Sequence, residues 1–269
     1  MPEVTSYAPG FPTWAELASP DPALSRRFYG ELLGWSSYTL TTEMDEYEIF
    51  TLGGVQAPEV AGMQTLVDDS LPSYWMCYFR TADVAASVEA VRAAGGHVLV
   101  EDIEVANLGR MALCSDLESA EFAFWYPYDL QGAGARNEPG ALYWMELACQ
   151  EAQAARAFYG RVFGWKAEER EYYTSSTYTN WKVGDTSVAS MVSMDEHWPP
   201  GYPAHWVPYF GVVDCDAAAA KAVDLGGRVT VSPKDIKRGR FAIVTDPTGA
   251  RLGVFSAAAT GGAATRAPL

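Results

Sequence analysis

The sequence predicts an α+β fold in which four β-α-β-β-β units form two tandem domains. Three observations predict it. The chain of 269 residues is long enough for about two domains. It repeats itself at a fixed offset, and each repeat alternates one helical stretch with several short strand stretches. With 49% hydrophobic residues, each half can bury a core of its own.

The repeat covers nearly the whole chain. At an offset of 130 residues the matched pairs are Trp14 with Trp144, Phe28-Tyr29-Gly30 with Phe158-Tyr159-Gly160, Gly34-Trp35 with Gly164-Trp165, Gly109-Arg110 with Gly239-Arg240, and Asp116 with Asp246. With one inserted residue, Trp75 and Tyr78-Phe79 match Trp206 and Tyr209-Phe210. So many matches at one offset indicate a duplicated domain. We expect domains at 11–128 and 140–257, a linker at 129–139 and a flexible tail at 258–269.

The elements of the first unit follow from local patterns. "TWAELA" alternates Trp14 and Glu16 with small or apolar neighbours, which predicts a strand. Asp21-Pro22 is an N-cap followed by proline at the first helical position, and Gly34 ends the helix. The apolar stripe of this helix consists of Leu24, Phe28 and Leu32. Three strands are predicted after it, at 35–40, 48–52 and 60–66.

The same order recurs three more times. In the second unit we expect a strand at 74–79, a helix over 83–94, and strands at 98–103, 110–114 and 122–125. The second domain follows the same pattern, and its last unit runs from the strand at 205–210 to the strand at 251–255. This order completes the four predicted units.

The composition excludes several classes of partner. The chain has 34 acidic and 19 basic residues, which argues against binding to nucleic-acid backbones or to anionic membranes. The first residues lack a basic n-region and an apolar h-region, and no run of 18 apolar residues occurs. The four cysteines (Cys77, Cys114, Cys149 and Cys215) form no CxxC pair, so we expect free, buried thiols in a cytoplasmic protein.

Aromatic residues are abundant, with 9 Trp, 15 Tyr and 11 Phe. This content favours a cavity lined by flat rings, although each ring taken alone could equally pack in a core. The candidate ligand-binding residues are Trp14, Trp75, Tyr78, Trp125, Trp144, Trp181, Trp206 and Tyr209. We therefore expect a small hydrophobic or aromatic molecule as the partner.

These landmarks together resemble the vicinal oxygen chelate superfamily, which includes glyoxalases, extradiol dioxygenases, and bleomycin- and fosfomycin-resistance proteins. The resemblance is to its tandem two-domain actinobacterial type, and it is carried by both Phe-Tyr-Gly and Gly-Trp pairs and by Asp246-Pro247-Thr248-Gly249. It implies that both domains are glyoxalase-like domains. In each of them, a mixed sheet is expected to curve into a cup around one cavity. It also leaves open whether the protein is a monomer, with its domains as a pseudo-dimer, or a homodimer.

Catalytic members of this superfamily hold a divalent metal on four inward strands. Position by position, the family's ligands would fall on Trp14 and Trp144, near Cys77 and Pro208, on Ala123 and Gly253, and within "VAGMQ" and "VASMV". These residues do not form a ligand set, so we expect neither a metal nor another cofactor. Glu16 with Glu121 is the one acidic pair expected to approach each other, and we expect Glu146 and Arg251 to form a salt bridge in the second domain. His205 could reach a cavity rim.

The glutamate two residues after each first-strand tryptophan is the candidate for chemistry. If Glu16 and Glu146 point into apolar cavities, desolvation raises their pKa and suits them to acid/base work. Alternatively they only stabilise their strands. We favour a metal-independent protein of specialised metabolism, an enzyme of lyase, isomerase, cyclase or hydroxylase-like type. A non-catalytic resistance protein that binds a drug or metabolite, and a metal-dependent glyoxalase or dioxygenase, stay open. The second domain keeps "DPTGA" where the first has "DLESA", so its cavity looks better preserved.

Overall fold

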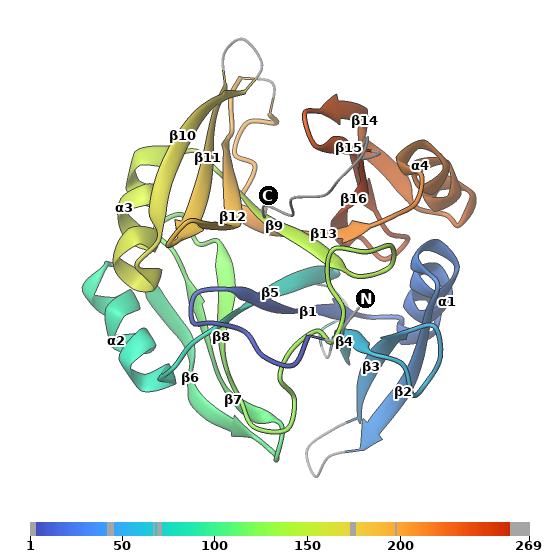
Figure 1. Ribbon diagram of the computed structural model, residues 1–269, viewed down its shortest axis with the longest axis horizontal. Helices are drawn as coiled ribbons and strands as arrows, with labels where there is room; N and C mark the ends of the chain where they lie inside the picture. The colour runs from blue at the N-terminus through green and yellow to red at the C-terminus, as the bar shows by residue number, and fades with distance from the viewer. Residues whose placement is uncertain are drawn as a thin grey trace.

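Each half of the chain forms one eight-stranded mixed sheet with two helices (Figure 1). The computed structural model describes residues 4–41, 46–66, 68, 72–172, 176–196 and 198–258. The first domain contains β1 (Pro12–Ser19), α1 (Pro22–Leu33), β2 (Trp35–Thr41), β3 (Glu46–Leu52), β4 (Glu59–Thr65), β5 (Tyr74–Arg80), α2 (Val84–Ala93), β6 (His97–Val105), β7 (Gly109–Ser115) and β8 (Glu121–Pro127). The second contains β9 (Leu142–Cys149), α3 (Ala152–Phe163), β10 (Lys166–Tyr172), β11 (Ser176–Val183), β12 (Thr186–Ser193), β13 (His205–Gly211), α4 (Cys215–Asp224), β14 (Arg228–Ile236), β15 (Gly239–Thr245) and β16 (Arg251–Ala257). The predicted α+β fold of four β-α-β-β-β units is confirmed.

The capping signals act as the sequence predicts. The Asp21 carboxylate accepts the backbone N–H of Leu24, and Pro22 occupies the first turn of α1. Gly34 ends this helix with φ of +75°, in the left-handed region that glycine adopts without steric cost. The helix therefore turns directly into β2.

The strand order explains how each sheet can hold a site. It is β2-β3-β4-β1-β5-β8-β7-β6 in the first domain and β10-β11-β12-β9-β13-β16-β15-β14 in the second. The two β-α-β-β-β units of a domain meet where β1 pairs antiparallel with β5, or β9 with β13, and each of these strands has a parallel partner on its other side. The halves of each sheet splay apart away from the other domain (Figure 1). We call the face between these halves cup 1 in the first domain and cup 2 in the second.

The opposite face of each sheet packs against the other domain. Helix α1 contacts α4, α2 contacts α3, and β5 contacts β13 (Figure 1). Tyr29 donates its hydroxyl to Asp246 across this interface at 2.8 Å, and Tyr159 donates to Asp116 at 3.0 Å in the reciprocal direction. The repeated Phe-Tyr-Gly and aspartate landmarks thus join the two domains.

The connection between the domains is held along its length. Tyr7 donates to the Ala133 carbonyl at 2.5 Å, the Gly134 N–H donates to the Glu59 backbone carbonyl, and Arg136 donates to the Pro12 carbonyl. The linker segment therefore packs on the first domain. The predicted flexible tail lies, apart from residue 258, outside the described residues.

Candidate functional site

Trp14 and Glu16 both point into cup 1, because side chains alternate along β1 and Ala15 and Leu17 face the other domain. The hydroxyls of Tyr47 and Tyr78 donate to the two carboxylate oxygens of Glu16, at 2.7 and 3.1 Å. The indole of Trp14 donates to the Tyr47 hydroxyl at 3.1 Å. Glu16 nevertheless keeps part of its surface open. A carboxyl group therefore lies on an aromatic floor, held by two phenols.

Cup 2 repeats this arrangement with one change of residue type. Tyr209 donates to one carboxylate oxygen of Glu146 at 2.8 Å and Ser190 donates to the other at 3.0 Å. The Trp144 indole donates to the Ser190 hydroxyl at 2.7 Å. In both cups, a tryptophan indole thus donates to a hydroxyl group that in turn donates to the glutamate. The hydroxyl belongs to a tyrosine in cup 1 and to a serine in cup 2.

Burial dominates the electrostatics of both glutamates. Desolvation raises the pKa of Glu16 and of Glu146 above the ordinary value, and the hydroxyls that bond to the carboxylates lower it in part. The same surroundings raise the pKa of Tyr78. Each cup therefore favours a protonated carboxyl group over a wider pH range than water does.

The cups differ in how closed they are. Gly62 of β4 pairs with Glu16, and Ser190 of β12 pairs with Glu146, so these two positions correspond. A Cβ atom on Gly62 would lie 1.8 Å from the Tyr47 hydroxyl, which means that the phenol occupies the place of the Ser190 side chain. Trp14 is 3% exposed beneath Tyr47, whereas Trp144 stays partly exposed. Tyr47 therefore closes the floor of cup 1. No local sequence pattern predicts this role of Tyr47, because its contact with Glu16 joins two strands that are not neighbours in the sheet.

Three of the predicted ligand-binding tryptophans lie outside the cups, which corrects the expectation that they line a cavity. Trp75, Trp181 and Trp206 lie in the hydrophobic core between the two sheets. Trp75 and Trp206 donate their indole N–H to Tyr29 and Tyr159 at 3.1 and 3.0 Å. They face this way because Trp75 and Trp206 pair with Leu17 and Leu147, which point to the other domain.

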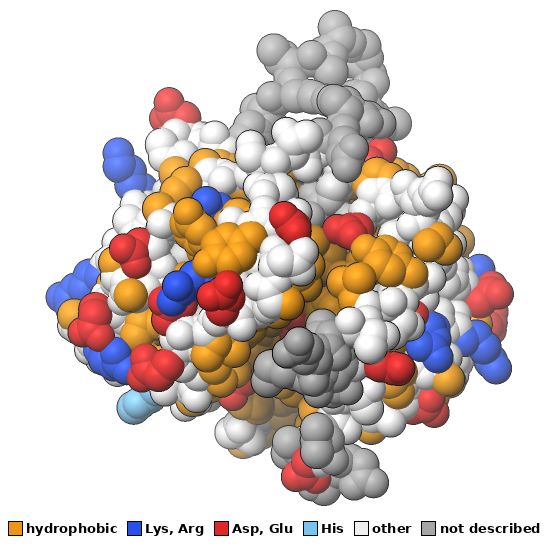
Figure 2. Space-filling model, turned by 90° about the horizontal axis from the view of Figure 1, so that it is seen from below, with side chains coloured by type: hydrophobic (Ala, Val, Ile, Leu, Met, Phe, Trp, Pro, Cys, Tyr) orange, Lys and Arg blue, Asp and Glu red, His pale blue; other side chains and the backbone are white. Residues whose placement is uncertain are grey.

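The remaining five candidates do lie in the cups. Trp14, Tyr78 and Trp125 belong to the hydrophobic cluster of cup 1, and Trp144 and Tyr209 belong to that of cup 2. Trp125 is fixed by a bond from its indole to the Leu130 carbonyl at 2.9 Å. Figure 2, which views the first domain from the side where its sheet opens, shows hydrophobic side chains around a hollow. The aromatic lining of the cups thus includes five of the eight predicted ligand-binding residues.

The donors in the cups do not fit a divalent metal. The central strands place Glu16, Gly62, Tyr78 and Ala123 in cup 1, and Glu146, Ser190, Tyr209 and Gly253 at the matching positions of cup 2. Cys77 faces the other domain, so the inward position on β5 is a tyrosine. Among the described residues, no three His, Cys, Asp or Glu side chains come together. One central glutamate in each cup, with a second carboxyl group, Glu121, only at the rim of cup 1, does not supply the ligands that such an ion needs.

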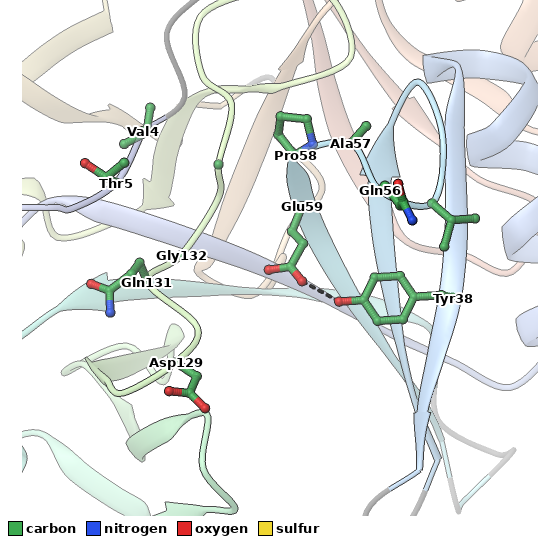
Figure 3. Close-up of a pocket in the computed structure, with 12 residues that line it drawn as sticks. Val4, Thr5, Tyr38, Gln56, Ala57, Pro58, Glu59, Asp129, Gln131 and Gly132 are labelled. Carbon is green, nitrogen blue, oxygen red and sulfur yellow. Dashed lines mark hydrogen bonds between the residues drawn. The ribbon is translucent and has the colours of Figure 1, made fainter.

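A separate pocket of about 630 Å³ opens beside cup 1 (Figure 3). Tyr38 and Glu59 form one wall, where the phenol donates to the carboxylate, and Asp129 and Gln131 lie opposite (Figure 3). No feature of the sequence pointed to it, because residues from the N-terminal segment, β2, the loop before β4, β4 itself and the linker form it together.

The rim of cup 2 differs from the sequence expectation. Arg251 forms no ion pair with Glu146 among the described residues. It donates instead to the Tyr202 hydroxyl at 2.5 Å and lies 3.3 Å from Nε2 of His205. His205 thus does lie at the rim. His197 lies outside the described residues.

Comparison with known proteins gives consistent results. The sequence model of the glyoxalase/bleomycin resistance protein/dioxygenase superfamily matches residues 141–254. The putative glyoxylase CFP32 of Mycobacterium tuberculosis is 34% identical over 96% of this chain and 99% of its own length. The anthracycline biosynthesis protein DnrV of Streptomyces peucetius is 35% identical over 97% of this chain and 100% of its own.

Solved structures share the fold at low identity. The Mn(II)-bound glyoxalase from Novosphingobium aromaticivorans superposes with a TM-score of 0.64 at 14% identity, over 92% of this chain and 82% of its own. The 2,3-dioxygenase LapB from Pseudomonas sp. KL28 gives 0.64 at 13% identity, over 98% of both chains. No helix among the described residues is long and apolar enough to cross a membrane.

Proposed function

Because the chain belongs to the glyoxalase/bleomycin resistance protein/dioxygenase superfamily, we propose that it acts without a metal on a planar or hydrophobic small molecule of specialised metabolism. The molecule lies over the aromatic floor of a cup, and Glu146 of cup 2 transfers a proton to or from it. One observation carries this proposal: a partly open glutamate with a raised pKa lies beside a tryptophan in each cup.

The proposed chemistry is general acid/base catalysis. A protonated Glu146 gives its proton to a ligand oxygen, and the resulting carboxylate is stabilised by the hydroxyls of Tyr209 and Ser190 that already point at it. The same carboxylate can then take a proton from a neighbouring ligand carbon, which moves a double bond. Proton transfers of this kind serve isomerisation and cyclisation, and they use only residues of this chain.

The relatives support an aromatic substrate. DnrV and DauV carry anthracycline biosynthesis in their names, and they are 35% and 34% identical to this chain over nearly its full length. We propose that the ligand of this protein is likewise a polycyclic aromatic compound. The residues of the cups argue against the metal-dependent glyoxalase or dioxygenase alternative, because they lack the donors that a divalent metal needs.

A non-catalytic binder remains the second candidate, and cup 1 favours it. Both carboxylate oxygens of Glu16 accept phenol donors there, and Trp14 is covered. A ligand could contact that floor only after Tyr47 moves. Cup 1 would then bind weakly or serve the fold alone.

The test separates binding from turnover. The purified protein is titrated with an anthracycline while tryptophan fluorescence is followed, and the mixture is analysed by mass spectrometry for a product. Glu146→Gln should retain binding within about threefold and lose turnover by about a hundredfold or more, within the range of lost acid/base catalysis. Glu104→Gln on the outer strand β6 is the matched control. Turnover that survives in both Glu16→Gln and Glu146→Gln would disprove the acid/base role, and binding without product would favour the binder.

A further inference from the structure

Matching rim positions of the two cups carry opposite charges. Arg251 begins β16 and Glu121 begins β8, and both occupy the same place in their sheets. Arg251 lies on the cup face, because the next residues on that face, Gly253 and Phe255, contact Tyr209 and its cluster. Cup 1 thus has a carboxylate at this rim, and cup 2 has a guanidinium.

Aromatic rings and a neutral histidine hold the Arg251 guanidinium in place. Its central carbon lies 5.3 Å from the ring centre of Tyr202 and 5.9 Å from that of Trp198. Burial lowers the pKa of His205 to about 4, so this imidazole is neutral at physiological pH. Its Nδ1 lies 2.8 Å from the Pro203 carbonyl and therefore carries the proton, which leaves Nε2 to accept from Arg251. The cluster keeps one full positive charge.

The part of the chain that the structure describes offers this charge no anionic partner. Within the described ranges, its hydrogen-bonding neighbours are a phenol and an imidazole. Its Nε is buried without an acceptor. In a chain of net charge −15, five other arginines (Arg26, Arg92, Arg110, Arg156 and Arg240) bond to carboxylates, whereas Arg251 lies on the cup face with neutral partners, which indicates a place for an anion.

We propose that cup 2 selects a ligand with an anionic group, a carboxylate or an ionised enol or phenol, which pairs with Arg251 while the planar body of the ligand lies over Trp144 and Glu146. This inference rests on the proposed function, since it names the class of molecule that the same cavity takes. The guanidinium presents planar donors that match an oxyanion, and the aromatic rings beside it continue the surface on which a planar ligand lies. Cup 1 has Glu121 at this position and therefore lacks the guanidinium that would pair with such a group.

The experiment uses two probes that share their rings and differ in charge. Anilinonaphthalene sulfonate carries an anionic group, and phenylnaphthylamine has the same rings without it. Both are titrated by fluorescence into the wild type, into Arg251→Gln and into Arg240→Gln. Arg240 pairs with Asp216 of α4, on the face of the second sheet opposite cup 2, and is the matched control. Circular dichroism and a thermal melt confirm that each variant is folded.

We expect the wild type to bind the sulfonate more tightly than the neutral probe. Arg251→Gln should weaken sulfonate binding by about tenfold to a hundredfold, the range expected for a lost charged hydrogen bond, and change neutral binding less than about twofold. Arg240→Gln should change neither. If Arg251→Gln does not fold, Arg251→Lys replaces it, and it should weaken the sulfonate selectively because lysine lacks the planar fork.

The two hypotheses fail in different ways. If neither probe binds to the wild type, the aromatic binding function is wrong and the inference is wrong with it. If the neutral probe binds to the wild type as tightly as the sulfonate, or if the Arg251 variant weakens both probes equally, the anion inference is wrong while the aromatic site stands.

Discussion

The Tyr29 hydroxyl forms one of the hydrogen bonds between the two domains, and Tyr29→Phe removes it with little change in shape. The ring of Tyr29 stacks on Trp35 at 5.6 Å between centroids, and phenylalanine keeps that contact. The lost oxygen donates to Oδ2 of Asp246 at 2.8 Å and accepts the indole N–H of Trp75 at 3.1 Å. Both partners are buried, so water cannot readily replace it.

The size of the effect follows from these two bonds. A hydrogen bond to a charged acceptor is worth about 1.5–3 kcal/mol, and an orphaned buried donor costs about 1–3 kcal/mol. Asp246 keeps its bonds from Thr248, Gly249 and Ala250, but these all reach Oδ1 and leave Oδ2 without a donor. We therefore expect Tyr29→Phe to lower the free energy of unfolding by about 3–5 kcal/mol.

Urea unfolding followed by tryptophan fluorescence measures this free energy. Tyr159→Phe removes the reciprocal bond to Asp116, and the bond from Trp206, and should lose a similar amount. Tyr128→Phe, at an exposed position, should lose less than about 0.5 kcal/mol and is the control. A loss below about 1 kcal/mol in both Tyr29→Phe and Tyr159→Phe would refute the view that these phenols join the domains.

Three further predictions concern the cups. Burial raises the pKa of Glu146 above 4.5, so its favourable contribution is complete below that pH and is lost as the pH rises through the folded-state value. Glu146→Gln should therefore gain thermal stability relative to the wild type between about pH 5 and pH 8, and a constant difference across that range would contradict the raised pKa. Tyr47→Ser should open cup 1 and expose Trp14. We expect acrylamide to quench the tryptophan fluorescence of this variant more strongly, and we expect a second molecule of the neutral probe phenylnaphthylamine to bind. An unchanged number of bound probe molecules would show that Tyr47 does not close the floor. Elemental analysis should find no stoichiometric Mn, Fe, Ni or Zn, and a chelator should leave turnover intact; a bound ion whose removal abolishes turnover would show that the cups do hold a metal.

The agreement between sequence and structure is closest where short-range patterns act alone. Asp21, Pro22 and Gly34 set the bounds of α1 through local hydrogen bonds and a single backbone angle. Alternation placed Trp14 and Glu16 on one face of their strand, and the repeat extended this result to the second domain. The superfamily and the fold could therefore be identified before any coordinates.

The sequence could not predict in the same way which face of its sheet each tryptophan side chain lies on. Both faces of these sheets are apolar, since one packs on the other domain and one lines a cup. Alternation separates Trp75 from Tyr78 but does not reveal which of the two faces is concave. The sequence analysis therefore assigned Trp75 and Trp206 to cavities, whereas their bonds to Tyr29 and Tyr159 belong to the domain interface.

By itself, the sequence determined the duplicated α+β architecture and the glutamate beside each first-strand tryptophan, because periodicity, capping and repetition are properties of neighbouring residues. Only the tertiary structure decided what those glutamates contact. Tyr47 comes to Glu16 from a strand that does not adjoin β1, and Arg251 meets Tyr202 and His205 from separate segments. Contacts between residues so far apart in the chain depend on how the sheets curve and pack, and no local pattern encodes that.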